Sequence, residues 1–400
     1  MISCLTRERN GEVESIQVEN RGKSLVITVN VDTNCRGDGS TARVKIPKLY
    51  GEEIFYDTEE NCQKEVSGII QELSTEKEHR HFYIPLRSEV ASYRLGEGIF
   101  SKSDTLMDTS TVDTKHYCTD DPYDNDIEGD GSCADLLANG ILNDPDLPRI
   151  KNMRIGCFTE FWGEDQEKEY DILVKMFTDN KEKFQHLESL FIGEIAPPLA
   201  DISGQYNGNY GELLKALPNL KSFVMQGIPG QLISNGETLD LPNLEELIII
   251  TGGLSGHIIE TFKTAKLPNL KKLIIYMGLE HYGLEVAAKD LVALAEKNRF
   301  PSLKYLGFVN SEEQNKIVEL LLSGDILPQI EVLDISFGCL DDKGAQIILD
   351  NVDKLAHLKE ILLEWHYVSD KLVAELEKSK LNIKLESPQD QKYLYPMITE

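Results

Sequence analysis

The sequence predicts an α/β protein in which a small α+β domain precedes a repeat solenoid, with a curved parallel sheet and outer helices. Three observations predict this fold. A nine-residue pattern occurs eight times after residue 146, the first hundred residues contain strand-like alternation, and an acidic stretch separates the two regions. A length of 400 residues agrees with two or three domains. We therefore expect the following division: a domain at 1–100, a linker at 101–131, the solenoid with about eight repeats and caps at 132–390, and a tail at 391–400.

The first hundred residues carry the signals of a small α+β domain. Segments 13–19 and 24–32 alternate apolar and polar residues around a turn at Asn20-Arg21-Gly22, which predicts a β-hairpin. Segments 41–46 and 81–86 resemble further strands. In 59–73, apolar side chains recur at i, i+3, i+4 and i+7, a spacing that predicts an amphipathic helix.

The segment that follows is strongly acidic. Residues 101–146 hold 2 basic and 12 acidic side chains, so they supply −10 of the total net charge of −27. Between 101 and 131 the segment is rich in Asp, Ser, Thr and Gly and lacks hydrophobic periodicity, which is typical of a linker. Ser132 and Asp135 have the spacing of a capping box, so we expect a helix to begin there.

The nine-residue pattern is the most informative feature of the chain. Its copies include LPNLKSFVM at 217–225 and LPNLEELII at 241–249, and successive copies begin 24 to 37 residues apart. Position 4 of the pattern is occupied in turn by Ile150, Leu187, Leu220, Leu244, Leu270, Leu303, Ile330 and Leu358. A last short strand around Ile383 is expected to cover the open end.

The repeats predict a two-sided sheet with helices between the strands. The intervals contain helical spacing, for example in 340–352. Positions 4, 7 and 9 are apolar and alternate with other residues, so in a strand they point into the solenoid and the intervening residues point outward on the concave side. Each repeat buries about three large apolar side chains, roughly 1.5–3 kcal/mol apiece, against its neighbours.

This pattern resembles the L-x-x-L-x-L core of the leucine-rich repeat family, and the interval lengths resemble its ribonuclease-inhibitor-like subclass. The phrases FWGE at 161–164, TGGL at 251–254, GLEHYG at 278–283 and EWHYVSD at 364–370 further look like bacterial stand-alone leucine-rich repeat proteins of unassigned function. The resemblance covers residues 147–390 and does not reach the first domain. The Pro-Asn lead-in, with Gly or His where the family prefers Asn or Cys, departs from the family consensus. His366 stands where the family's ladder Asn turns the chain, so we expect a buried, hydrogen-bonded structural role for it.

The outward positions predict a protein-binding surface, because a curved sheet presents them as one face. Several are large and apolar, and apolar patches on a surface are typical of partner sites. Two alternatives remain: the first domain or the acidic linker covers this face, or its apolar character has no role. The expected partner-binding residues on the concave face are Phe191, Val224, Ile248, Ile274, Tyr276, Tyr305, Phe337, Leu362 and Trp365.

Composition indicates a cytoplasmic protein whose partner is another protein. With 41 Lys+Arg against 68 Asp+Glu, the chain is too acidic to favour nucleic acid or anionic lipid as a general partner. No apolar stretch is long enough to span a membrane, and the first ten residues lack a signal-peptide core. The seven cysteines include no CxxC pair and are expected to be reduced thiols. We expect no cofactor and no obligatory small molecule.

A weaker candidate is a calcium site in the acidic segment. Asp124, Asp126, Glu128 and Asp135 place oxygen ligands at alternate positions around Gly129, in part like an EF-hand loop. The shorter Asp135 at the last position and the absence of a preceding helix favour a solvated acidic linker instead. A calcium-responsive adaptor is therefore the third functional hypothesis.

An enzyme is the second hypothesis. In that case catalysis would lie in residues 1–100 and the solenoid would select the substrate, whereas in the first hypothesis the N-terminal domain is an effector or docking module. No nucleophile with its base is recognisable in the sequence. A protein–protein interaction module is accordingly the function that the sequence favours.

Overall fold

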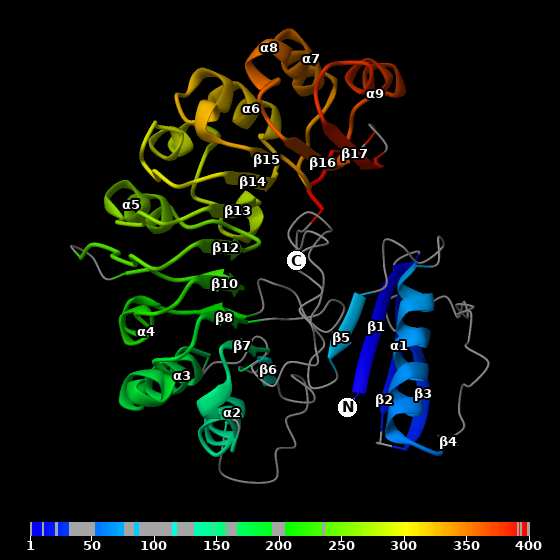
Figure 1. The fold of residues 1–400 in the computed structure, drawn as a ribbon. Helices are drawn as coiled ribbons and strands as arrows, with labels where there is room; N and C mark the ends of the chain where they lie inside the picture. The colour runs from blue at the N-terminus through cyan, green and yellow to red at the C-terminus, as the bar shows by residue number, and fades with distance from the viewer. Residues whose placement is uncertain are drawn as a thin grey trace. The chain divides into compact units, whose positions relative to one another are not determined.

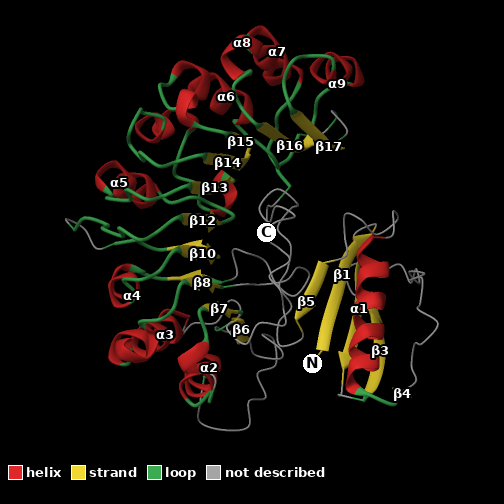
Figure 2. Ribbon diagram, in the orientation of Figure 1, coloured by secondary structure: helices red, strands yellow, loops and turns green. Residues whose placement is uncertain are grey.

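The structure is a computed structural model of the whole chain, and it divides into two compact units that meet in sequence between Thr111 and Val112. Figure 1 shows the course of the chain, and Figure 2 shows its secondary structure. The described residues are 2–9, 12–20, 23–31, 53–75, 84–87, 114–117, 132–145, 147–156, 158, 166–193, 205–233, 237–389, 392 and 394–397.

The N-terminal unit is an antiparallel sheet with one helix, in strand order β4-β3-β2-β1-β5. The predicted hairpin is confirmed, because β2 pairs with β3 antiparallel and Val18 lies opposite Ile27. The predicted helix is confirmed as α1, which contacts β1, β2, β3 and β5. Buried Leu25, Cys62 and Val66 belong to this sheet and helix. The bounds are β1 Ile2–Arg9, β2 Glu12–Asn20, β3 Ser24–Val31, β4 Glu53–Phe55, α1 Glu59–Thr75 and β5 Ile84–Arg87.

Two strands of this unit, β1 and β4, were not predicted from the sequence. Strands β1 and β4 extend the hairpin on its two sides, through the pairs β1–β2 and β3–β4. The strand expected at 81–86 is observed as β5, Ile84–Arg87. The strand expected at 41–46 lies outside the described residues.

The second unit is built around one sheet of ten strands in which every neighbouring pair is parallel, in the order β17-β16-β15-β14-β13-β12-β10-β8-β7-β6. The helices α3 to α9 lie along one side of the curved row of strands (Figure 1). Its strands are β6 Thr114–Tyr117, β7 Asn152–Ile155, β8 Ser189–Ile192, β10 Ser222–Gln226, β12 Glu246–Ile250, β13 Lys272–Gly278, β14 Tyr305–Ser311, β15 Val332–Asp334, β16 Glu360–His366 and β17 Ile383–Pro388.

Most intervals between these strands are helical, as the apolar spacing predicts, but the described residues between β10 and β12 include β11 and no helix. The α-helices are α2 Cys133–Leu142, α3 Gln166–Asp179, α4 Gly211–Ala216, α5 Gly256–Thr264, α6 Gln314–Ser323, α7 Asp342–Asp350, α8 Val352–Leu355 and α9 Asp370–Glu377. Short 3₁₀ helices are η1 Leu147–Arg149, η2 Lys181–Phe184, η4 Glu280–Tyr282, η5 Ala288–Leu294 and η6 Leu327–Gln329. A separate two-stranded sheet joins β9 Tyr206–Asn207 to β11 Ile228–Pro229.

The chain from residue 101 to 131 is not wholly a linker, because β6 lies inside it and pairs with β7 as the first strand of the large sheet. At the other end, the expected closing strand is confirmed as β17, which pairs with β16. β6 and β17 form backbone hydrogen bonds with the strands next to them, β7 and β16, whose N–H and C=O groups would otherwise lack partners at the ends of the sheet.

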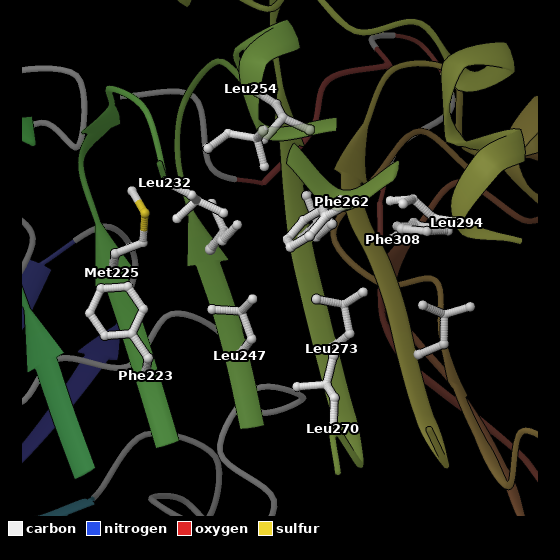
Figure 3. Close-up of a cluster of buried hydrophobic side chains, with 14 of the residues drawn as sticks. Phe223, Met225, Leu232, Leu247, Leu254, Phe262, Leu270, Leu273, Leu294 and Phe308 are labelled. Carbon is white, nitrogen blue, oxygen red and sulfur yellow. The ribbon is translucent and has the colours of Figure 1, made fainter. Parts of the chain in front are cut away.

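The core follows the repeat, because equivalent positions lie beside one another in the sheet. The residues at position 4 are all buried, and those at position 7 form one row across the strands. That row is Met153, Leu190, Phe223, Leu247, Leu273, Leu306, Leu333 and Ile361, all of which are buried in one hydrophobic cluster. Figure 3 shows part of this cluster, with Leu247 and Leu273 on neighbouring strands and Phe262 of α5 packed nearby. The alternation therefore places positions 4, 7 and 9 in the core, as predicted.

The unusual Pro-Asn lead-in has a structural reason. The side chain at position 3 of seven repeats forms a hydrogen bond with a main-chain carbonyl at position 1 or 2 of the preceding repeat. These bonds run from His186 to Leu147, Asn219 to Gln185, Asn243 to Pro218, Asn269 to Pro242, Ser302 to Pro268, Gln329 to Phe300 and His357 to Leu327, with lengths of 2.7–3.0 Å. We call this set the position-3 ladder. It gives each repeat a polar contact with its neighbour in addition to the backbone pairing.

The ladder makes a testable prediction at Asn243, whose Nδ2 donates to the Pro218 carbonyl at 3.0 Å. Asn243→Asp removes the donor and brings a negative charge to the carbonyl, so we expect the free energy of unfolding to fall by about 1 kcal/mol. Asn243→Ser is the matched control, because Ser302 makes the equivalent bond in a later repeat. Urea denaturation measures both variants, and an equal loss in the two would contradict a donor role.

Candidate binding face of the parallel sheet

The second face of the sheet is formed by side chains that do not belong to the solenoid core. Position 8 of each repeat lies between two core positions, and the registers align these residues as one row, which we call the central row. Its members are Arg154, Phe191, Val224, Ile248, Ile274, Gly307, Asp334 and Leu362, and none of them is part of the hydrophobic core cluster. The expected separation of two faces is therefore present in the structure.

The central row is not a solvent-exposed apolar surface. For most of the nine expected partner-binding residues, the expectation of solvent exposure is wrong. Six of the nine expected partner-binding residues are buried, with Ile274, Tyr276 and Phe337 at 0% exposure. The others in this group are Phe191, Val224 and Ile248. Tyr305, Leu362 and Trp365 are half-buried. Whether any of the nine contacts a partner stays a prediction.

Neighbouring side chains on this face shield one another. The rings of Tyr276 and Phe337 are stacked, with centroids 6.2 Å apart and planes inclined by 13°. The guanidinium of Arg154 lies 5.4 Å from the centre of the Phe191 ring. Strand spacing of about 4.8 Å brings side chains of adjacent repeats, such as Arg154 and Phe191, into contact, whereas the Tyr276 and Phe337 rings meet across the intervening β14. The pattern of a single repeat reveals neither contact.

A chain of polar contacts crosses the sheet beside the central row. The Ser222 hydroxyl donates to Glu246 at 2.6 Å, and the Glu246 carboxylate lies 3.1 Å from the Lys272 ammonium. The Lys272 Nζ is in turn 5.2 Å from the centre of the Tyr305 ring. The Tyr305 hydroxyl donates to Asp334 Oδ2 at 2.8 Å. Residues from five adjacent strands thus form one network.

Asp334 is the buried end of this network. Burial raises the pKa of its carboxyl group, whereas hydrogen bonds from Ser336 and Tyr305 act in the opposite direction. The Ser336 N–H donates to Asp334 Oδ1 at 3.1 Å. Burial likewise raises the pKa of Tyr305, and the neighbouring Asp334 adds to that effect. The hydroxyl therefore stays protonated and available to donate to the carboxylate.

Gly307 makes room for this arrangement in the central row. A Cβ atom at Gly307 would lie 3.2 Å from two side-chain carbons of Ile274 and 3.3 Å from Asp334 Cβ. A side chain at this position would require Ile274 or Asp334 to shift by a few tenths of an ångström, so glycine allows both residues to pack closely on its two sides.

A continuous accessible row of this face lies at position 6, where the strands begin. These side chains are half-buried and mostly polar, and we call them the entry row. They are Asn152, Ser189, Ser222, Glu246, Lys272, Tyr305, Val332 and Glu360. The entry row crosses eight neighbouring strands, so it offers a long polar surface next to the buried central row. Tyr305 is the one entry-row residue among the expected partner-binding residues, because those were predicted from apolar and aromatic character.

Of the expected calcium ligands, only Asp135 lies among the described residues. Asp124, Asp126 and Glu128 lie outside the described residues. Asp135 Oδ2 accepts hydrogen bonds from the Ser132 N–H and hydroxyl, and the Ser132 hydroxyl accepts from the Asp135 N–H. This reciprocal arrangement confirms the predicted capping box at the start of α2. Among the described residues there is no group of three or more His, Cys, Asp or Glu side chains that could hold a metal ion.

His366 has the structural position that its place in the sequence suggested. It is buried at the end of β16, and its Nδ1 accepts a hydrogen bond from the Val368 N–H at 3.2 Å. Burial lowers the pKa of its imidazole to about 4. The side chain is therefore neutral at pH 7 and acts as an acceptor that holds the turn after the strand.

The buried carboxylate yields a double-mutant prediction. Tyr305→Phe removes the hydroxyl donor from Asp334, so we expect the free energy of unfolding at pH 7 to fall by about 1–3 kcal/mol. In an Asp334→Ala background the same substitution should cost markedly less, because the acceptor is gone. Urea denaturation of the four proteins measures the coupling, and strictly additive losses would contradict the contact.

His366 predicts a pH dependence with a defined sign. Between the ordinary pKa of 6.5 and the folded-state value of about 4, the unfolded chain binds a proton that the folded chain does not, so stability falls as the pH falls. From pH 7 to pH 5, wild type should lose about 2 kcal/mol more than His366→Asn. The exposed His257→Asn is the control and should follow wild type. Equal pH profiles for wild type and His366→Asn would exclude this role.

No family model matches the chain, and no curated protein matches it. Among the described residues, no helix is both long and apolar enough to cross a membrane. A crystal structure of a Bacteroides fragilis protein, from the Northeast Structural Genomics Consortium, is 31% identical in sequence and has a TM-score of 0.62. The similarity covers 100% of this chain and 99% of the other, so it includes the N-terminal unit. The chain therefore belongs to the same family as this Bacteroides fragilis protein.

Proposed function

We propose that this chain is a leucine-rich repeat protein of the ribonuclease-inhibitor-like subclass and acts as a protein–protein interaction module. The buried leucine-type positions, the parallel sheet and the helices between its strands support the repeat class. The solenoid would hold the sheet rigid and present its second face to a partner protein. A bacterial origin agrees with the similarity to the Bacteroides fragilis protein.

The observation that carries this proposal is the entry row. Eight half-buried side chains, supplied by eight consecutive repeats, lie in one line on the side of the sheet away from the core. A partner that follows this line would contact several repeats at once, which suits a protein better than a small molecule. The central row would then support the site from below, and the half-buried Leu362 and Trp365 would add apolar contacts at one end.

The network around Asp334 supports a preformed site. Glu246, Lys272 and Tyr305 are entry-row residues, and each is held by a contact with a neighbouring strand. Side chains that are already fixed lose little conformational entropy when a partner binds. The proposed interaction therefore requires little rearrangement of the sheet.

The cytoplasm is the compartment that we propose for this interaction. Cys339 is a buried free thiol in the described part of the chain, which suits a reducing compartment. The excess of acidic residues in the full sequence suits a soluble partner rather than an anionic surface.

Site-specific photo-crosslinking tests the proposed face in the cells that make the protein. A photoreactive phenylalanine analogue at Ser189 or Glu360 of the entry row should give the same discrete crosslinked partner. The matched control is Val292, which is 56% exposed in η5 between β13 and β14, in the helical part of that repeat. Crosslinks of equal yield at Val292, or none at either entry-row position, would overturn the proposed face.

A further inference from the structure

We infer that Phe337, Trp365 and Tyr367 form a site for an extended, proline-containing peptide, and that residues 394–397 of the same chain occupy it in the structure. This inference deepens the proposed function, on which it rests, because it names the kind of partner segment that the last repeats accept. Phe337 follows β15, Trp365 lies near the end of β16 and Tyr367 comes directly after it; residues 394–397 form hydrogen bonds with all three.

The contacts with the C-terminal segment involve its main chain. The Tyr395 carbonyl accepts hydrogen bonds from Trp365 Nε1 at 3.1 Å and from the Tyr367 hydroxyl at 2.6 Å. The Tyr395 N–H donates to the same Tyr367 hydroxyl at 2.9 Å. Two residues later, the Met397 N–H donates to the Phe337 carbonyl at 2.8 Å. One tyrosine hydroxyl thus binds both polar groups of a single peptide residue, as donor and as acceptor.

The side chains of the segment explain why proline is part of the specificity. Pro396 is buried, whereas Leu394 and Tyr395 remain 44% and 48% exposed. Proline has no N–H that would need a partner at this buried position, and its ring disfavours a helical conformation of the preceding Tyr395. The peptide class is therefore X-Pro-X, in which the flanking residues contribute main-chain groups and the proline contributes the buried ring.

The backbone of the aromatic residues is specialised for this site. Phe337 and Trp365 have positive φ angles of 66° and 55°, in a region that bulky residues rarely adopt. They lie two residues after the nine-residue pattern of their repeats. Other repeats have Gly227 and Asn310 at this place, and these residue types accept positive φ more readily. Two repeats therefore place large aromatic residues at a position that favours small or amide residues, and these are the two repeats that contact the segment.

The position of the site next to the sheet face links it to a partner. Phe337 is stacked on Tyr276, a residue of the expected partner face. A partner segment that binds here must displace the chain's own residues 394–397, which are covalently linked and present at a high effective concentration. The C-terminal segment therefore acts as an internal competitor. A partner's X-Pro-X segment must bind strongly enough to displace it.

A peptide-binding experiment with the full chain tests this inference. The tail is disabled by Pro396→Asp with Met397→Pro, which removes the buried ring and the N–H that donates to Phe337. The probe is a fluorescein-labelled peptide with the sequence of residues 391–400, and binding is followed by fluorescence anisotropy. We expect the tail-disabled chain to bind the peptide about tenfold or more tightly than wild type, in which the site is occupied.

Two controls make the result specific. Adding Tyr367→Phe to the tail-disabled chain should weaken peptide binding about tenfold, because both hydrogen bonds of the hydroxyl are lost. A peptide that carries the same two substitutions as the disabled tail should not bind. Thermal unfolding verifies that each protein is folded.

The outcomes separate this inference from the proposed function. Equal peptide binding by wild type and the tail-disabled chain, no binding by the tail-disabled chain, or no effect of Tyr367→Phe would overturn the peptide site. If entry-row crosslinks still form in that case, the proposed binding face stands. If the peptide binds as expected but no entry-row crosslink forms, the peptide site stands and the proposed face fails.

Discussion

The stacking of equivalent apolar positions in neighbouring repeats is the constraint on which the rest of the solenoid depends, and the position-3 hydrogen bond adds a polar contact to it. In parallel strands the backbone bonds set the spacing, but they do not by themselves fix how each helical interval returns to the sheet. The position-3 side chain connects this return to the preceding repeat through a main-chain carbonyl, for example from Asn269 to Pro242. The core residues of one repeat are thereby held beside those of the next, and the hydrophobic cluster runs through the unit without interruption.

A rigid core on one side of the sheet leaves the other side available for different chemistry. The central row packs tightly around Gly307, and the polar network ends on the buried Asp334. Burial of such a carboxyl group costs free energy, which its hydrogen bonds from Tyr305 and Ser336 offset. Accessible groups remain at the entry row and at the aromatic end near Trp365, and the two proposals use these two places.

Sequence patterns predicted the repeat well, because each strand must place the same positions in the core. The hairpin, the helix after residue 58, the capping box and the closing strand were predictable for the same local reasons. Exposure on the second face was not predictable, because the pattern of one repeat does not show which distant residues, such as Gly307, pack against the buried Ile274. The roles of Asp334 and Tyr367 also depend on partners 29 and 28 residues away along the chain. The sequence gives only one sign of these roles: Asp334 is an acidic side chain in the mostly apolar central row.

The position-3 ladder has a consequence for how proteins of this kind can change during evolution. Asn, Ser, Gln and His all serve as donors in it, and the acceptor is a carbonyl that every residue possesses. A repeat can therefore be duplicated, exchanged or given a longer helical excursion without new complementary side chains in its neighbours, provided that a donor is kept. The unequal intervals of 24 to 37 residues are what such tolerance would produce.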